Sequence, residues 1–207
     1  MKPNYQAMTE EILRTHRKAG ETPRLFLHSC CAPCSSYVLE YLSEVFSITV
    51  FYYNPNIYPR EEYDHRVREQ QEFIRRFPTK NPVSFVEGDF DEARFYDAVR
   101  GMEHLPEGDA RCFACYELRL REAAEKAREY GADYFCTTLS ISPLKNAEKL
   151  NEIGERLAAE YGVRYLPSDF KKKEGYKRSG ELSRAYGMYR QNYCGCVFSM
   201  RGEEKGN

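Results

Sequence analysis

Short apolar runs alternate with longer amphipathic segments along most of the chain. The run at 47–53, for example, is rich in β-branched and aromatic residues, as is typical of a buried strand. Two of the longer segments stop at a Tyr-Gly pair, where glycine fits the left-handed position just past a helix end. The pattern predicts strands at 25–27, 47–53, 83–86, 133–138 and 163–166, and helices at 4–18, after Pro33, at 60–77, at 112–130 and at 146–161.

Helices that alternate with short apolar strands indicate a parallel sheet covered on both faces. We therefore expect an α/β fold with a doubly wound, mostly parallel sheet of about five strands. A chain of 207 residues suffices for one well-buried core, and two domains would be crowded. The single domain would span 1–207, with an N-terminal helical arm at 1–22 and a catalytic core at 23–200.

Composition describes an ordinary globular protein, with 42% hydrophobic and 30% charged residues. The N-terminal residues have no apolar core of signal-peptide length, and no run approaches a membrane span. We expect a cytoplasmic protein without a membrane partner. Because cytoplasmic thiols stay reduced, its cysteines are expected to bind metal or to cycle between redox states.

The formal net charge of −1 does not indicate a nucleic-acid binder, but the charge is unevenly distributed. Residues 171–190 hold seven basic side chains and two carboxylates, a local excess of seven minus two, or +5. From charge alone, a solvated helix face explains this segment as well as an anion-binding surface does. The basic residues are Lys171, Lys172, Lys173, Lys177, Arg178, Arg184 and Arg190.

Seven of the eight cysteines fall into three short clusters, at 30–34, 112–115 and 194–196. The first follows a predicted strand, and the second begins a predicted helix. Ligands collect outside the carboxyl ends of parallel strands, where helix N-termini also favour thiolates. Two clusters should therefore meet at one edge of the sheet. The eighth, Cys136, lies in a predicted strand and is expected in the core.

Two kinds of metal centre fit the first two clusters. Cys31-x2-Cys34 and Cys112-x2-Cys115 have zinc spacing, but a zinc site leaves no use for Cys30. A [4Fe–4S] cluster needs four thiolates and tolerates distant loops, so it fits better. We predict Cys30, Cys31, Cys112 and Cys115 as its ligands. Cys34 is then left for a second metal or for substrate, although spacing does not decide which of the five is spare.

The third cluster, Cys194-Gly195-Cys196, is of a different kind. A disulfide across one glycine would be strained and easily reduced, which suits a redox-cycling pair. Two further metal ligands, or two inert thiols, are the alternatives.

Two weaker signals complete the candidates. Asp109, three residues before Cys112, either caps the helix or serves as a metal ligand or proton donor. Tyrosines near the end of the second strand are structural or stack on a base. They are Tyr52, Tyr53, Tyr58 and Tyr63.

Five motifs occur in order between residues 24 and 200. They are HSCCAPCS at 28–35, YNPNI at 53–57, RCFAC at 111–115, Thr137-Thr138 with Ser142-Pro143, and RQNYCGC at 190–196. Together they resemble the cobalamin-independent epoxyqueuosine reductases of the QueH type. The resemblance implies reductive removal of the epoxide oxygen of epoxyqueuosine at the tRNA wobble position. It also implies a [4Fe–4S] cluster, with a further iron left open, and a fold related to the adenine-nucleotide α-hydrolase (HUP) superfamily.

Under this resemblance, HSCCAPCS stands where relatives that use ATP carry a glycine-rich phosphate loop, which argues against ATP use. Cys194 and Cys196 would relay electrons from an external donor. The anticodon loop would be held through its phosphates, and these contacts position RNA without reading sequence. Expected phosphate contacts are Ser142, Lys145, Lys171, Lys172, Lys173, Lys177 and Arg178. A zinc-stabilised tRNA-binding module and a thiol–disulfide oxidoreductase are the alternative functions.

Overall fold

The computed structural model describes residues 3–200 of the chain. A five-stranded sheet lies at its centre, and all its neighbouring strands pair in parallel. The strand order β3-β2-β1-β4-β5 places the first strand in the middle. The strands are β1 (Arg24–His28), β2 (Ser47–Tyr52), β3 (Val83–Glu87), β4 (Tyr134–Thr137) and β5 (Arg164–Tyr165).

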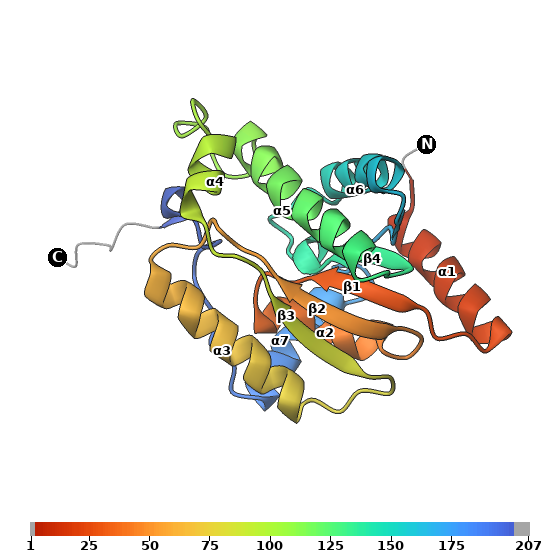
Figure 1. The fold of residues 1–207 in the computed structure, drawn as a ribbon. Helices are drawn as coiled ribbons and strands as arrows, with labels where there is room; N and C mark the ends of the chain where they lie inside the picture. The colour runs from red at the N-terminus through yellow and green to blue at the C-terminus, as the bar shows by residue number, and fades with distance from the viewer. Residues whose placement is uncertain (1–2, 201–207) are drawn as a thin grey trace.

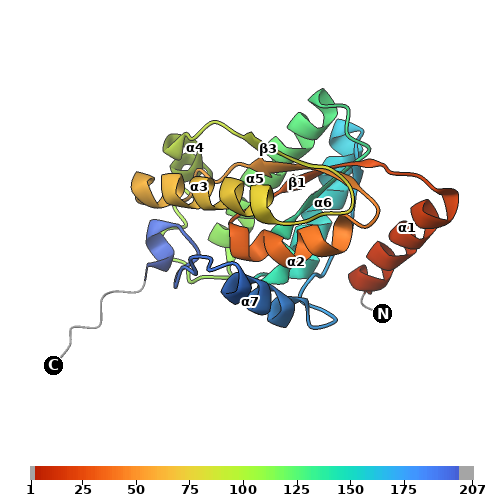
Figure 2. The same cartoon turned by 90° about the horizontal axis from the view of Figure 1, so that it is seen from below.

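Helices cover both faces of this sheet, so the predicted doubly wound α/β fold is confirmed. Helices α5 and α6 lie on one face, and α2, α3 and α7 lie on the other (Figures 1 and 2). The helices are α1 (Tyr5–Ala19), α2 (Ala32–Leu42), α3 (Arg60–Arg76), α4 (Glu92–Ala98), α5 (Ala110–Glu129), α6 (Ala147–Tyr161) and α7 (Gly175–Ala185), with 3-10 turns η1 (Thr138–Ile141) and η2 (Val197–Ser199).

The central strand explains why the apolar runs are continuous rather than alternating. In β1, Leu25 and Leu27 pack with Val38 and Leu39 of α2, whereas Phe26 packs into the layer under α5. Every residue of β1 after Arg24 is buried. A strand buried on both faces needs apolar residues at consecutive positions.

The pattern missed the short elements. Helix α7, inside the basic segment, contains Gly175 and Gly180, and glycine inside a helix weakens its propensity. Helix α4 is a seven-residue helix, too short to show a periodic pattern. Strand β5 is shorter than predicted, although Leu166 still donates its N–H to Phe135 O at 2.9 Å. No helix within residues 3–200 is both long and apolar enough to span a bilayer.

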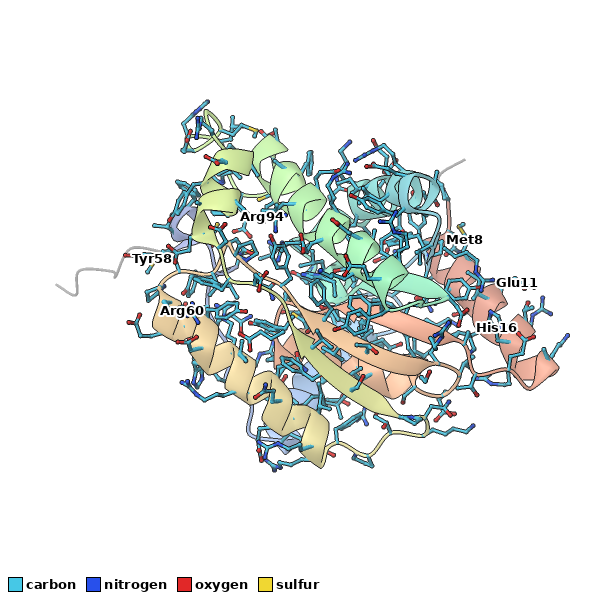
Figure 3. The ribbon with its side chains drawn as sticks, viewed as in Figure 1. Met8, Glu11, His16, Tyr58, Arg60 and Arg94 are labelled. Carbon is cyan, nitrogen blue, oxygen red and sulfur yellow. The ribbon has the colours of Figure 1, made fainter. Side chains whose placement is uncertain are left out.

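The segment from 188 to 200, here called the C-terminal strap, lies along the edge where the strands end. Tyr58 N–H donates to Gly195 O at 2.8 Å, and Gln191 Nε2 donates to Cys31 Sγ at 3.2 Å. In Figure 3, Tyr58 lies at this edge, while His16 on α1 lies at the far end of the molecule. The strap thereby brings the third cysteine cluster to the carboxyl edge of the sheet.

Candidate metal and active centre

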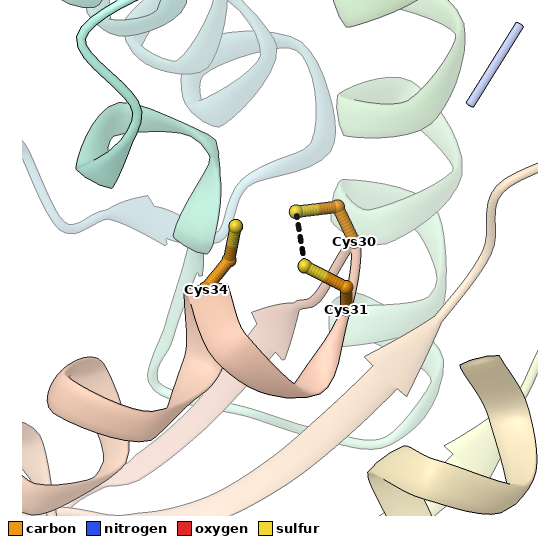
Figure 4. Close-up of side chains that lie close together, drawn as sticks. All are labelled: Cys30, Cys31 and Cys34. Carbon is orange, nitrogen blue, oxygen red and sulfur yellow. Dashed lines mark hydrogen bonds between the residues drawn. The ribbon is translucent and has the colours of Figure 1, made fainter. Parts of the chain in front are cut away.

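The first thiol group consists of Cys30, Cys31 and Cys34, between the end of β1 and the first turn of α2 (Figure 4). Their sulfur atoms all lie within 4.8 Å of one another, and Cys30 Sγ lies 3.9 Å from Cys31 Sγ. Pro33 stands in the first turn of α2, where a missing N–H costs nothing. The turn from strand to helix therefore gathers the three thiols at a helix N-terminus.

Hydrogen bonds within this group lower the pKa of one sulfur and raise the pKa of the other two. The Cys31 and Cys34 thiols, assisted by Arg119, lower the pKa of Cys30 well below its usual value. The same contact with Cys30 raises the pKa of Cys31 to about 12, and the pKa of Cys34 is raised as well. The group thus favours a thiolate at Cys30, the form that binds metals.

The second thiol group consists of Cys112 and Cys115 from α5 with Cys194 and Cys196 from the C-terminal strap. All four line one small cavity. Gly108 N–H donates to Cys112 Sγ at 3.2 Å, and burial raises the pKa of Cys115 to about 11. Four cysteines from two distant parts of the chain therefore line the same small cavity.

Arg119 lies between the two thiol groups, at the wall of both the small cavity and a larger one that Cys30 and Cys34 line. It is 2% exposed, and its Nη1 donates to Asn54 Oδ1 at 3.2 Å. Its Nη2 has no hydrogen-bond partner within residues 3–200. Burial acts to lower its pKa, but Cys115, Cys194 and Cys30 outweigh that effect and raise it. A permanent positive charge thus faces both groups.

Lys145 is a second buried cation at this site. Its Nζ lies 2.9 Å from Cys194 Sγ and 3.0 Å from Glu107 Oε1. Burial alone would lower its pKa, but Cys194 and Tyr116 outweigh burial and raise it. The ammonium therefore stays charged, and it lines both cavities.

The larger cavity has a volume of about 190 Å³. It lies between the first thiol group, the loop after β4, helix α7 and the C-terminal strap. Its lining includes thiols, cations, amides and apolar side chains, a mixture typical of ligand sites. The lining residues are Cys30, Pro33, Cys34, Glu107, Arg119, Leu139, Ile141, Ser142, Leu144, Lys145, Tyr176, Ser179, Arg190, Gln191, Asn192, Tyr193, Cys194 and Ser199.

The structure places the predicted ligands in two separate groups. Cys34 lies with Cys30 and Cys31, whereas Cys112 and Cys115 lie in the other group. Asp109 is exposed and caps α5, accepting a hydrogen bond from Ala110 N–H at 2.6 Å. Cys136, expected in the core, is fully buried there.

The basic segment is largely neutralised by neighbouring carboxylates. Lys171 lies 2.6 Å from Asp169, and Arg178 lies 2.6 Å from Glu40. Lys173 pairs with Glu10, and Lys177 pairs with Glu174 at 3.4 Å. Among the five expected phosphate contacts of this segment, Lys172 alone has no ion pair within the described part of the chain. Of the other expected contacts, Ser142 lines the larger cavity and Lys145 pairs with Cys194.

Sequence reasoning missed Arg119, the central cation. A signal was present, because positions 112, 115 and 119 share one face of a helix. The buried His28 is structural, with Nδ1 2.8 Å from Thr137 Oγ1 and Nε2 3.1 Å from Tyr53 O. Burial lowers its pKa to about 4, so the ring is neutral at pH 7.

Comparison with known proteins shows which family the chain resembles. Residues 25–202 match the family model described as Epoxyqueuosine reductase QueH. A Staphylococcus epidermidis protein of that name is 43% identical over 202 residues, covering 96% of this chain and 85% of the relative. A Streptococcus pyogenes relative is also 43% identical, covering 97% and 79%. A Thermotoga maritima relative is 38% identical over 180 residues, covering 85% and 90%.

Proposed function

The chain belongs to the Epoxyqueuosine reductase QueH family and is an oxidoreductase of tRNA modification, and from this premise we propose that it reduces epoxyqueuosine at the tRNA wobble position to queuosine. Two electrons and two protons remove the epoxide oxygen as water and leave an alkene. The observation that carries the proposal is the larger cavity, where three thiols and two buried cations meet. The reaction needs redox chemistry and positive charge at the departing oxygen. The thiols of this cavity offer ligands for a redox-active metal, and its two buried cations offer the positive charge.

The donor set fits an iron–sulfur centre. The predicted set of Cys30, Cys31, Cys112 and Cys115 would draw ligands from both thiol groups. The grouping favours instead a [4Fe–4S] cluster on the four thiols of the second group and a further iron on the first. Arg119 Nη2 and Tyr116 OH, both buried without partners within residues 3–200, line the small cavity and would donate to cluster sulfur. Such a centre would supply single electrons and a Lewis-acidic metal.

The chain's own residues supply charge and protons. Arg119 and Lys145 line the cavity as fixed positive charges, which stabilise negative charge that develops on an oxygen in a water-poor site. Lys145 carries a proton that it can give to the departing oxygen as the carbon–oxygen bond breaks. Glu107, which pairs with Lys145 and has a 35% exposed side chain, connects this proton to bulk water. Asp109, a helix cap, takes no part in this scheme.

The partners follow from the same premise. We propose a cytoplasmic location, a tRNA anticodon loop as substrate and an external electron donor that returns the centre to its reduced state. Ser142 at the cavity wall and the basic residues 171–178 remain the expected contacts to RNA phosphates. Such contacts predict that binding weakens steeply with added salt.

Cys194 and Cys196 would serve either as a redox pair or as cluster ligands, and an experiment distinguishes the two roles. As a redox pair they would leave the metal untouched, and as cluster ligands they would be needed to hold it. Their place beside Cys112 and Cys115 favours the ligand role. Iron analysis of Cys194→Ser decides between the roles, because a ligand variant loses iron and a relay variant keeps it while turnover stops.

Anaerobic purification tests the metal centre. We expect a brown protein with iron and acid-labile sulfide and with broad absorption in the visible region. A colourless protein with about one zinc per chain would indicate the zinc-stabilised tRNA-binding module. A metal-free protein that needs only Cys194 and Cys196 would indicate the thiol–disulfide oxidoreductase. A protein without iron after cluster reconstitution would contradict the proposal.

A further inference from the structure

Two side chains on the rim of the larger cavity have no role in the chemistry above. Tyr176, in the first turn of α7, is 46% exposed, and Arg190 belongs to the C-terminal strap. Both line the cavity, and both are accessible from solvent. An exposed aromatic ring and an arginine at the entrance of a site form a recognisable pair in proteins that bind single-stranded nucleic acid.

Helix α7 is built to accept Arg190. Gly180 lies inside this helix, where glycine costs about 1 kcal/mol relative to alanine. A Cβ atom at Gly180 would lie 3.2 Å from Arg190 Nη1, closer than side chains normally pack. The glycine thus leaves room for the guanidinium against the helix. The arginine therefore lies against α7 at the rim of the cavity and stays exposed to solvent.

Arg190 differs from the basic residues earlier in the segment, because Lys172 and Arg184, which also lack an ion pair within residues 3–200, do not line the cavity. Lys171, Lys173, Lys177 and Arg178 each pair with a carboxylate. Arg190 has no ion pair with any residue of the described range 3–200. An unpaired guanidinium can bind a phosphate in a bidentate manner without first breaking an internal bond.

Tyr176 also stands apart from the tyrosines singled out by sequence. Tyr52, Tyr53 and Tyr63 are fully buried and cannot meet a base. Tyr58 is exposed but does not line the larger cavity. Tyr176 both lines it and presents its ring to solvent, with the 64% exposed Leu144 also on the rim. An exposed aromatic or apolar pair of this kind offers a base a stacking surface.

We propose that Tyr176 and Arg190 form a nucleotide-docking rim, where Tyr176 stacks on an anticodon-loop base next to the reacting nucleotide and Arg190 binds a neighbouring phosphate. The inference rests on the proposed function in that it takes the substrate to be RNA. It adds Arg190, which has no ion pair within residues 3–200, to the expected phosphate contacts. A loop, rather than a duplex, is the fitting partner because only unpaired bases are free to stack on a side chain.

The test measures equilibrium binding of a synthetic anticodon stem-loop RNA to the purified protein at several salt concentrations. Tyr176→Ala should weaken binding roughly tenfold, as expected for loss of one stacked base, whereas Tyr176→Phe should bind as wild type does. Arg190→Gln should weaken binding and reduce the slope of log affinity against log salt by about 0.7, the value for one phosphate contact on a single strand. Lys177→Gln should change that slope much less.

Matched controls lie at the other end of the molecule. Tyr130→Ala removes a 51% exposed tyrosine at the end of α5, and Lys80→Gln breaks a surface ion pair with Glu44. Neither should alter binding. A second series uses stem-loops with an abasic residue at each loop position in turn. At one position the abasic RNA should bind wild type and Tyr176→Ala equally, because the stacking partner is missing from both.

The outcomes separate this inference from the proposed function. If Tyr176→Ala and Arg190→Gln bind the stem-loop as wild type does, or if no abasic position removes the tyrosine effect, the docking rim is wrong. Wild-type protein that reduces the epoxide without measurable RNA binding also overturns it. Protein that shows both binding effects but never reduces epoxyqueuosine overturns the proposed function and leaves the docking rim standing.

Discussion

The two edges of the sheet differ in how their polar groups are satisfied. Where the strands begin, Asp133 Oδ2 accepts a hydrogen bond from Arg24 N–H at 2.8 Å, and Tyr134 OH lies 3.0 Å from His16 Nε2. Where the strands end, Arg119 is buried with one nitrogen unpartnered within residues 3–200. These polar groups at the amino edge bond to one another, whereas the carboxyl edge has a buried donor without a partner in the described residues.

The difference shows which edge of the sheet carries groups that destabilise the folded protein. A buried charge without a full set of partners destabilises a protein, commonly by a few kcal/mol. Native structures tolerate such groups where a ligand satisfies them. The thiols and cations at the carboxyl edge are therefore expected to affect activity and metal content, and the bonds at the amino edge to affect stability alone.

Replacing one cysteine at each of two places gives the largest expected contrast. Cys30→Ser removes a thiol of the first group and should lower activity by more than about 100-fold, with loss of bound iron. Cys136→Ser changes a fully buried cysteine on the adjacent strand, whose Sγ donates to Leu166 O at 3.2 Å. It should retain its iron. Equal iron loss in the two variants would show that core packing, rather than the site, determines metal retention.

Arg119→Met removes the charge between the two thiol groups and keeps an unbranched side chain there. We expect activity to fall between about 10- and 100-fold, as for other residues that support metal ligands. The reduction potential of the bound centre should also become more negative, because a nearby cation stabilises the more negatively charged reduced state. Arg121→Met, on the outer side of the same helix, is the control and should change neither quantity. An unaltered potential in Arg119→Met would remove Arg119 from the site.

Acid should destabilise the protein through His28. Its pKa is lowered to about 4 by burial and by Arg119, whereas an unfolded chain has the usual value near 6.5. Above pH 6.5 both states are neutral and the group contributes nothing. As pH falls from 6.5 towards 4, only the unfolded state takes up the proton, so stability decreases. Between pH 7 and pH 5 the loss is about 2 kcal/mol.

Denaturant unfolding of wild type and His28→Gln at the two pH values isolates this effect. The variant should lack that part of the acid sensitivity. Equal losses in both proteins would mean that other groups cause it.

The smallest effect is expected at the amino edge. Asp133→Ala removes the acceptor for Arg24 N–H and should lower the free energy of unfolding by about 1 kcal/mol. Its turnover should equal that of wild type, measured at a temperature where both are folded. A clear loss of turnover would mean that the two edges are coupled, against the division of roles drawn above.

The sheet could be predicted from sequence because its central strands, β1 and β4, are buried on both faces. That burial leaves continuous apolar runs, such as the one in β1, and Gly162 marks a helix end in the left-handed conformation. Helix α7 could not be predicted because it contains Gly175 and Gly180, which have low helix propensity and are favoured at these positions by close packing. In both cases the space for a side chain is taken by residues outside the helix, Phe170 and Tyr37 at Gly175 and Arg190 at Gly180.

The sequence predicted which cysteines form the candidate site better than it predicted how they are arranged in space. Strand topology correctly places the first two cysteine clusters at one edge. Spacing, however, did not decide which of the five cysteines is spare, and the predicted ligand set left out Cys34, whose Sγ lies within 4.8 Å of those of Cys30 and Cys31. Nor did it bring Cys194 beside Cys112, which depends on how the C-terminal strap returns over the edge. The role of a buried arginine is likewise a property of three-dimensional surroundings.

The most direct measurement of the central claim is reduction of the epoxide itself. Iron-loaded wild type and Cys30→Ser are incubated without oxygen with tRNA that contains epoxyqueuosine and with a low-potential chemical reductant, and the nucleosides are analysed by mass spectrometry. The account predicts that wild type converts epoxyqueuosine to a nucleoside with one oxygen atom fewer, queuosine, and that Cys30→Ser does not. Iron-loaded wild type that binds the RNA yet leaves the epoxide intact, or Cys30→Ser that converts it at the wild-type rate, would contradict the account.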